Sequence, residues 1–493
     1  MGIEYIMVII FVLGYIAIAL EHNIKVDKAA SALLIGMLCW GAYAMWPSEH
    51  LKVDDEQSIY TLIKDKELRE NNEAFVDFLQ HEEEEYREEV FKNPTLYEGR
   101  ERIPVEETKE YVHHYVEHGL THHLFEIASI LFFLLGAMTI VELIDAHEGF
   151  AVITDRIKTT NKVALLWTIC LLTFFMSAAL DNLTTSIVMI SVIRKLIKSQ
   201  ETRWLFGGFI IIAANAGGAW SPIGDVTTTM LWNNGQIPST GIIITNLIIP
   251  SMAALLVPLT IASFFTKGTV ERPVKQEDAT HYTNPTTTTE RNIVFFLGLT
   301  GLLFVPVFKT LTHLPPFTGM MLSLGVLWMV TEIMHASKNK ELRRNLSVIT
   351  VLQKVDTASV LFFLGILMAV AALQEVGHLA HVAGFLDSAM DGNMYTINIS
   401  IGLLSAIVDN VPLVAAAQGM YPVSEGVFAE NGMFWQFLAY CAGTGGSALI
   451  IGSAAGVAVM GLEKISFGWY LKKISVYAII GYAAGAAVYY FMF

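Results

Sequence analysis

The sequence predicts an all-α polytopic membrane protein with two inverted repeats, each containing a re-entrant hairpin and a discontinuous transmembrane helix. Three observations support this fold class. The composition is unusually apolar, a set of short motifs occurs twice at nearly constant spacing, and the basic residues are distributed unevenly along the chain.

The composition indicates a chain that lies mostly in lipid. Of its 493 residues, 54% are hydrophobic and 16% are charged, whereas about a quarter of a typical soluble domain is charged. Several apolar runs reach the roughly 18 to 20 residues that cross a bilayer as a helix. Backbone polar groups in lipid must be satisfied within each segment, which favours helices. A net charge of −15 argues against a nucleic-acid partner.

The N-terminal third combines membrane helices with one polar segment. We expect two helices within residues 1–46, at about 3–20 and 29–46, and then an acidic extramembrane insert at 47–121. Apolar residues in the insert recur at helical spacing, which predicts short amphipathic helices. His114, His118 and His122 fall on one helical face beside His113 and His123. A solvated face, a Zn²⁺ site and a pH sensor all fit that pattern.

Two membrane repeats follow, separated by a polar cytoplasmic linker at 267–291. Repeat 1 (122–266) has expected elements at 123–143, 163–196 (hairpin), 203–234 (broken helix) and 241–265. Repeat 2 (292–493) has expected elements at 292–308, 316–334, 357–373, 396–424 (hairpin), 433–462 (broken helix) and 469–493. Glu126 and Glu142 lie near opposite ends of the 123–143 helix and are interpreted as interfacial.

The duplication is visible in three blocks that keep their order. Residues 126–134 resemble 356–364 at an offset of 230, and the Asp181-Asn182 and Asp409-Asn410 pairs are 228 residues apart. The glycine breaks that begin at Gly217 and Gly445 repeat at the same 228 offset.

Basic residues indicate that the repeats are inverted, because short cytoplasmic loops are enriched in Lys and Arg. Both flanks of the first Asp-Asn segment are basic, whereas residues 355–463 contain no Lys or Arg. The two hairpins would then enter from opposite sides, with their tips near the middle of the membrane. The acidic insert is expected outside the cell.

Polar side chains inside these apolar segments mark the candidate site, since an acid at membrane depth is costly and usually functional. Broken helices supply helix ends and free carbonyls that bind small ions at a repeat interface. The candidate ion- and proton-binding residues are Asp181, Asn182, Ser177, Asp225, Ser221, Thr228, Asp409, Asn410, Ser405, Thr444, Ser447 and Ser453. The candidate helix-break residues are Gly217, Gly218, Pro222, Gly224, Gly445, Gly446 and Gly452. The cation itself is expected at Asp181, Asn182, Asp409 and Asn410.

Oxygen-rich and sulfur-free, such a site suits a hard cation like Na⁺. A poorly hydrated carboxylate can hold either a proton or a cation, which is sufficient for Na⁺/H⁺ antiport. Asp181, Asp225 and Asp409 could instead act only as helix N-caps. Coupled uptake of an anion is a second reading, and an intramembrane aspartyl protease a third, although Pro222-Ile223-Gly224 lacks the Gly-x-Gly expected there. No enzymatic activity and no cofactor are expected.

The two Asp-Asn hairpins, the Ser-Pro-Ile-Gly-Asp break at 221–225 and the helix motif at 132–142 resemble the NhaD-type sodium/proton antiporters. These belong to an ion-transporter superfamily that also contains sodium/dicarboxylate symporters. The resemblance covers about residues 120–490. It implies Na⁺ and H⁺ (with Li⁺ as a further cation) as transported ions, scaffold and transport subdomains, a homodimer, elevator-like movement and a multi-pass location in the cell (inner) membrane. The insert at 47–121 departs from the family pattern.

Overall fold

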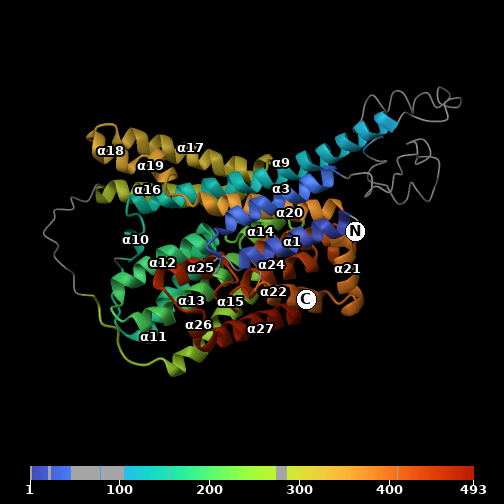
Figure 1. Cartoon of the computed structure of the whole chain (residues 1–493). Coiled ribbons are helices and arrows are strands. Elements are labelled where there is room, and N and C mark those ends of the chain that lie inside the picture. Colours follow the sequence, from blue (N-terminus) through green and yellow to red (C-terminus); the bar gives the residue numbers. More distant parts are fainter. Residues whose placement is uncertain are drawn as a thin grey trace. The chain divides into compact units, whose positions relative to one another are not determined.

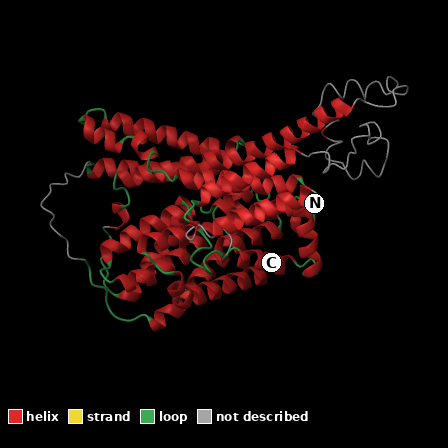
Figure 2. Ribbon diagram, viewed as in Figure 1, coloured by secondary structure: helices red, strands yellow, loops and turns green. Residues whose placement is uncertain are grey.

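The structure is a computed structural model that describes residues 3–19, 24–45, 78, 105–154, 156–273, 286–407 and 409–493. These residues form helices joined by turns and loops, and the described part of the chain has no β-strand (Figure 2). The acidic run at 82–85 and nearly all of the remaining insert up to residue 104 lie outside the described residues.

The helices of the first half follow the expected order (Figure 1). They are α1 (Ile3–Ala19), α3 (Lys28–Met45), α9 (Val105–Ala146), α10 (Ala151–Thr154), α11 (Lys162–Leu180), α12 (Asn182–Leu196), α13 (Gln200–Ala219), α14 (Val226–Asn233) and α15 (Thr240–Phe265). One helix differs from its expected limits: α9 begins at Val105 instead of near residue 123. The helical spacing of the apolar residues before 121 continues without a break into the membrane segment, so a single helix forms.

The second half contains α16 (Thr288–Thr312), α17 (Pro316–His335), α18 (Lys340–Leu346), α19 (Val348–Leu352), α20 (Thr357–Glu375), α21 (His378–Ala389), α22 (Met394–Leu404), α23 (Asn410–Met420), α24 (Met433–Gly445), α25 (Ala454–Glu463), α26 (Phe467–Lys473) and α27 (Ser475–Met492). Short α18, α19 and α21 lie in stretches for which the sequence predicted no element, and the element expected at 469–493 is divided into α26 and α27.

Eight helices among the described residues are long and apolar enough to cross a membrane. Large apolar side chains are strongly exposed on several of them, including Phe265 (77%) and Phe491 (84%). Apolar exposure of this extent marks a surface that contacts something other than water. The helices therefore have the lengths and surfaces of a polytopic membrane protein.

The described chain divides into two compact units, to which α9 and α20 both contribute. Unit 1 comprises Met1–Ala128 and Leu361–His381, and unit 2 comprises Ser129–Val360 and Val382–Phe493. In unit 1, α3 packs closely against α20, because Gly36 and Gly365 each lie where a Cβ would collide with the other helix. The Trp40 indole donates a hydrogen bond to the Met368 carbonyl at 2.9 Å across the same contact.

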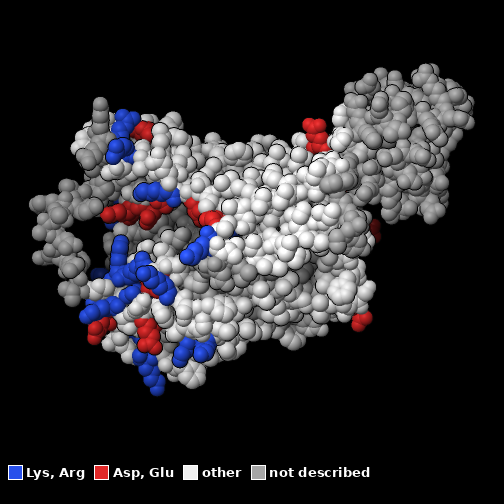
Figure 3. Space-filling model, in the orientation of Figure 1, with Lys and Arg blue, Asp and Glu red and all other residues white. Residues whose placement is uncertain are grey.

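Unit 2 contains every candidate ion-binding residue. Its α12, α13 and α25 are joined at one end by Glu463, whose side chain is only 1% exposed and pairs with Arg194 (2.6 Å) and Arg203 (3.0 Å). Figure 3 shows Lys and Arg side chains of unit 2 gathered at the end that carries α18 and the start of α11.

Candidate functional site

Four helices in unit 2 begin at a polar residue that interrupts an apolar segment. Asp181 caps α12, Asp225 caps α14, Asp409 caps α23 and Ser453 caps α25, and each side chain accepts a hydrogen bond from a backbone N–H in the first turn. Asp and Ser are favoured at this position because they satisfy otherwise unpaired N–H groups. The capping role considered from the sequence therefore exists at all three aspartates.

A buried hydrogen-bond network connects two of these caps. The Asn182 amide donates to Asp225 Oδ2 at 2.9 Å and to Asn215 Oδ1 at 3.1 Å. The Asn215 amide in turn donates to Ser447 Oγ and Ser453 Oγ, both at 2.9 Å. The network thus joins α12, α13 and the α14 cap to the second half of the chain.

Asp225 is the acid at the centre of this network and is only 1% exposed. Its Oδ1 accepts from the Thr227 N–H (2.9 Å) and hydroxyl (2.8 Å), while Oδ2 accepts from Asn182. A Cβ added at Gly443 would lie 3.7 Å from Oδ2, so α24 passes directly beside the carboxylate. Asp181 and Asp409 are near enough for their charges to repel that of Asp225.

Asp181 has a different environment. Its carboxylate accepts from the Thr184 N–H (2.8 Å) and hydroxyl (2.7 Å), which lie in its own helix. Its backbone has φ 72° and ψ 161°, a region that is nearly restricted to glycine and costs of order 1–3 kcal/mol. A strained residue of this kind persists only where the surrounding packing imposes it.

Asp409 caps its helix more weakly and without strain. Its φ is −49°, and it accepts from the Val411 N–H at 3.4 Å. The neighbouring Asn410 is 4% exposed. This second pair therefore lies at a helix start, as the first pair does.

The candidate hydroxyls mainly hold helices together. Ser177 donates to the Ala214 carbonyl (2.6 Å) and Ser405 to the Ala442 carbonyl (3.2 Å), two bonds related by the 228-residue offset. Ser221 donates to Ala178, Thr228 to Ala219 and Thr444 to Tyr440, in each case to a carbonyl. A hydroxyl that donates its proton keeps lone pairs that can still contact a cation.

The candidate break glycines lie where backbones approach each other. A Cβ on Gly217 would collide with the Phe174 carbonyl, and one on Gly445 with the Gly402 carbonyl. Gly224 against Ala178 and Gly452 against Ala406 form a second related pair. Gly218 and Gly446 each contact the glycine at the far end of their own break, at 224 and 452. Pro222 lies inside the first break.

Asn215 is the functional candidate that sequence reasoning missed. It is fully buried, and its side chain hydrogen-bonds to polar side chains of the network. Its position at the head of the broken segment, after an apolar run at 209–214, was the available signal.

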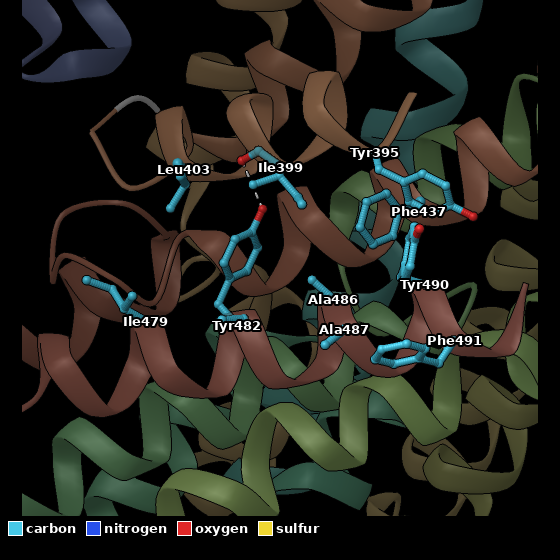
Figure 4. Close-up of a pocket in the computed structure, with 11 residues that line it drawn as sticks. Tyr395, Ile399, Leu403, Phe437, Ile479, Tyr482, Ala486, Ala487, Tyr490 and Phe491 are labelled. Atoms are coloured by element: carbon cyan, nitrogen blue, oxygen red, sulfur yellow. Dashed lines mark hydrogen bonds between the residues drawn. The ribbon is translucent and has the colours of Figure 1, made fainter. Parts of the chain in front are cut away.

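Unit 2 also contains an apolar cavity, whose lining differs from the polar side chains of this network. A groove of about 460 Å³ lies between α22, α24 and α27 and is lined by residues such as Tyr395, Phe437 and Phe491 (Figure 4). The Tyr482 hydroxyl at its wall already donates to the Ile399 carbonyl at 3.0 Å. A hydrated ion would find few partners there.

Comparisons with known proteins agree with the resemblance seen in the sequence. The family profile described as "Citrate transporter" (CitMHS) matches residues 5–436. "Sodium/proton antiporter 1" of Arabidopsis thaliana is 51% identical over 371 residues, which are 75% of this chain and 63% of that protein. The chain thus spans less than two thirds of that relative's length. "Sodium/proton antiporter 2" of the same plant is 46% identical over 376 residues (75% and 86%).

A bacterial relative extends the similarity further. "Na(+)/H(+) antiporter NhaD" of Alkalimonas amylolytica is 31% identical over 400 residues, covering 76% of this chain and 79% of that protein. The matched families are transporters and not enzymes. The chain belongs to the citrate-transporter (CitMHS) family of membrane transporters and to the NhaD-type sodium/proton antiporters.

Proposed function

We propose that this protein exchanges Na⁺, with Li⁺ as an alternative cation, for H⁺ across the membrane. The observation that carries the proposal is the buried Asp225 carboxylate, which accepts a hydrogen bond from Asn182. Through the Asn182 amide it is linked to Asn215, and through the Asn215 amide to Ser447 and Ser453. One carboxylate with amide and hydroxyl oxygens is a donor set for a hard cation. No cofactor is required.

The exchange follows from competition at the same oxygen atoms. A buried carboxylate is unstable as a bare anion, so it holds either a proton or a cation. Binding of Na⁺ releases the proton on one side, and protonation releases Na⁺ on the other. Asp181 and Asp409, at the starts of α12 and α23, add negative charge that favours cations over anions.

We further propose an architecture, a type of movement and an oligomeric state for this exchange. The two halves form inverted repeats with re-entrant hairpins, and the hairpins with the broken helices move as one elevator-type body in a homodimer. The matching contacts at an offset of 228 support the repeats, and the basic end of unit 2 supports a cytoplasmic face. A location in the cell (inner) membrane and a role in pH homeostasis fit this activity.

Sodium-coupled transport of a dicarboxylate or another anion is the second candidate. It is favoured by the four helix N-termini at the site, each with roughly half a positive charge. Three of the four caps are carboxylates, however, and their negative charge would repel an anion.

The deciding experiment uses purified protein in liposomes with a preset proton gradient. We expect Na⁺ and Li⁺ alone to collapse the gradient across pH 6 to 10, while K⁺ does not. Uptake of labelled succinate or citrate that requires Na⁺, without any response to cations alone, would favour the anion transporter instead.

Two variants test the assignment of the site. We expect Asp181→Asn and Asp409→Asn each to abolish exchange while the protein still inserts and elutes as a single species in detergent. Full exchange activity in both variants would exclude these aspartates from the ion pathway.

A further inference from the structure

A second group of metal-ligating side chains lies in unit 1, outside the ion site. His122, His123 and Glu126 on α9 each offer one ligand atom, and these atoms all lie within 4.8 Å of one another. His123 Nδ1 is 3.8 Å from Glu126 Oε2. The two imidazole rings are nearly perpendicular, with centroids 5.7 Å apart.

Glu375, at the end of α20, fixes the orientation of the buried His123 ring. Its Oε1 lies 2.8 Å from His123 Nε2, and its side chain is 19% exposed. Gly119, one turn before His123, leaves room for the carboxylate, since a Cβ there would lie 3.3–3.5 Å from its atoms. The Glu375 contact places a proton on Nε2.

That tautomer leaves the lone pair of His123 on Nδ1, the nitrogen on the side of Glu126. A histidine whose other nitrogen donates to a carboxylate is the usual arrangement at metal centres, where the carboxylate orients the ligand and raises its basicity. Two imidazoles and a carboxylate are ligands that Zn²⁺ and similar ions prefer, with water in the fourth position.

We propose that His122, His123 and Glu126 bind a divalent transition metal of the Zn²⁺ class, with Glu375 as the positioning residue. Ligand atoms on a tetrahedral Zn²⁺ ion are about 3.3 Å apart, given metal–ligand distances near 2.0–2.1 Å. The exposed His122 and half-buried Glu126 side chains can close the remaining distance by small rotations. Without the metal, a charged His123 would carry one proton on Nε2, towards Glu375, and one on Nδ1, towards Glu126. The ion takes the place of the Nδ1 proton.

The test is a Co²⁺ titration of the full-length protein in detergent after removal of metal with EDTA. Tetrahedral Co²⁺ with nitrogen and oxygen ligands absorbs visible light strongly, whereas hydrated Co²⁺ absorbs weakly. We expect one saturable tetrahedral site that Zn²⁺ displaces. Absence of a saturable tetrahedral band would overturn the proposal, because His123 would then be only an ion-pair partner of the two glutamates.

Variants assign the site to these residues. His122→Gln and Glu126→Gln should each weaken Co²⁺ binding at least tenfold, and Glu375→Gln should weaken it 10–100-fold, as expected for an orienting carboxylate. The matched control is His113→Gln, an exposed histidine on the same helix, which should bind as the wild type does. Equal affinity in His122→Gln, verified as folded by its metal-free melting temperature, would contradict the assignment.

Discussion

The break between α13 and α14 and the break between α24 and α25 are related by 228 residues, and they can be compared position by position. Their backbone contacts agree: Gly217 touches the Phe174 carbonyl in α11, and Gly445 touches the equivalent Gly402 carbonyl in α22. Their polar side chains differ at several positions, three of which concern the buried network. Asn215 corresponds to Gly443, Ala219 to Ser447 and Asp225 to Ser453.

Of these six residues, all but Ala219 lie in or beside the same buried network. Asn215, Asp225, Ser447 and Ser453 form the buried network, and Gly443 passes beside the Asp225 carboxylate. The backbone contacts of the break glycines are alike in the two halves, whereas the side chains that lie between the two breaks differ. The first half supplies the acid and the amide, and the second half supplies hydroxyls, so we expect the two halves to contribute unequally to exchange.

Among the residues of the two breaks, the largest expected effect is on Asp225. Asp225→Asn should lower Na⁺/H⁺ exchange at least 100-fold, because a carboxamide holds neither the proton nor the charge that balances Na⁺. Ser453→Ala removes the corresponding hydroxyl from the second half and should retain measurable exchange. Both are measured by Na⁺-induced collapse of a proton gradient in proteoliposomes. Equal loss in the two variants would show that the asymmetry of the breaks has no functional meaning.

A smaller effect is expected for Asn215. Asn215→Ala leaves Asn182, Ser447 and Ser453 without a shared partner, and an unsatisfied buried polar group costs about 1–3 kcal/mol. We expect about a tenfold weaker apparent affinity for Na⁺ with some exchange retained. Asn233→Ala is the matched control, because its amide donates only to the adjacent Asn234 among the bonds described. An unchanged affinity in Asn215→Ala would exclude the network from cation binding.

The glycine contacts should behave alike in both halves. Gly217→Ala and Gly445→Ala each place a Cβ against a carbonyl, and overpacking of this kind typically costs 1–3 kcal/mol. We expect similar decreases in melting temperature in detergent. Gly461→Ala in α25, where nothing lies within 4 Å of the added atom, should leave stability unchanged or raise it slightly. Strongly unequal decreases would mean that only one break is tightly packed.

The positions of the helix breaks could be predicted from the sequence, whereas the side-chain contacts that connect the two breaks could not. An Asp in an apolar run, or Pro222 and Gly224 together, signals an interrupted helix through local chemistry alone. Two partners of Asn215, Ser447 and Ser453, are more than 230 residues away, and no local pattern specifies such a contact. Glu463 similarly resembles an exposed helix-end acid, yet it is buried between Arg194 and Arg203. The start of α9 was misjudged because polar residues do not by themselves end a helix.

One buried histidine lies outside the network. His147 follows the end of α9, with Nδ1 2.7 Å from the Leu143 carbonyl and Nε2 2.8 Å from His335 Nε2. Burial lowers the pKa of His147 to about 4 by disfavouring its charged form, whereas an unfolded histidine has a pKa near 6.5. Between about pH 6.5 and 4 the unfolded chain therefore binds more protons, and stability falls as the pH falls.

We expect His147→Gln to flatten this decrease in melting temperature between pH 7 and 4. The pH profile of Na⁺/H⁺ exchange should stay as in the wild type, because the transported proton is assigned to Asp225 and not to the pair His147 and His335. A shifted exchange profile in His147→Gln would place a proton-binding group outside the breaks. The asymmetry between Asp225 and Ser453 would then no longer be sufficient to explain how the protein couples the two ions.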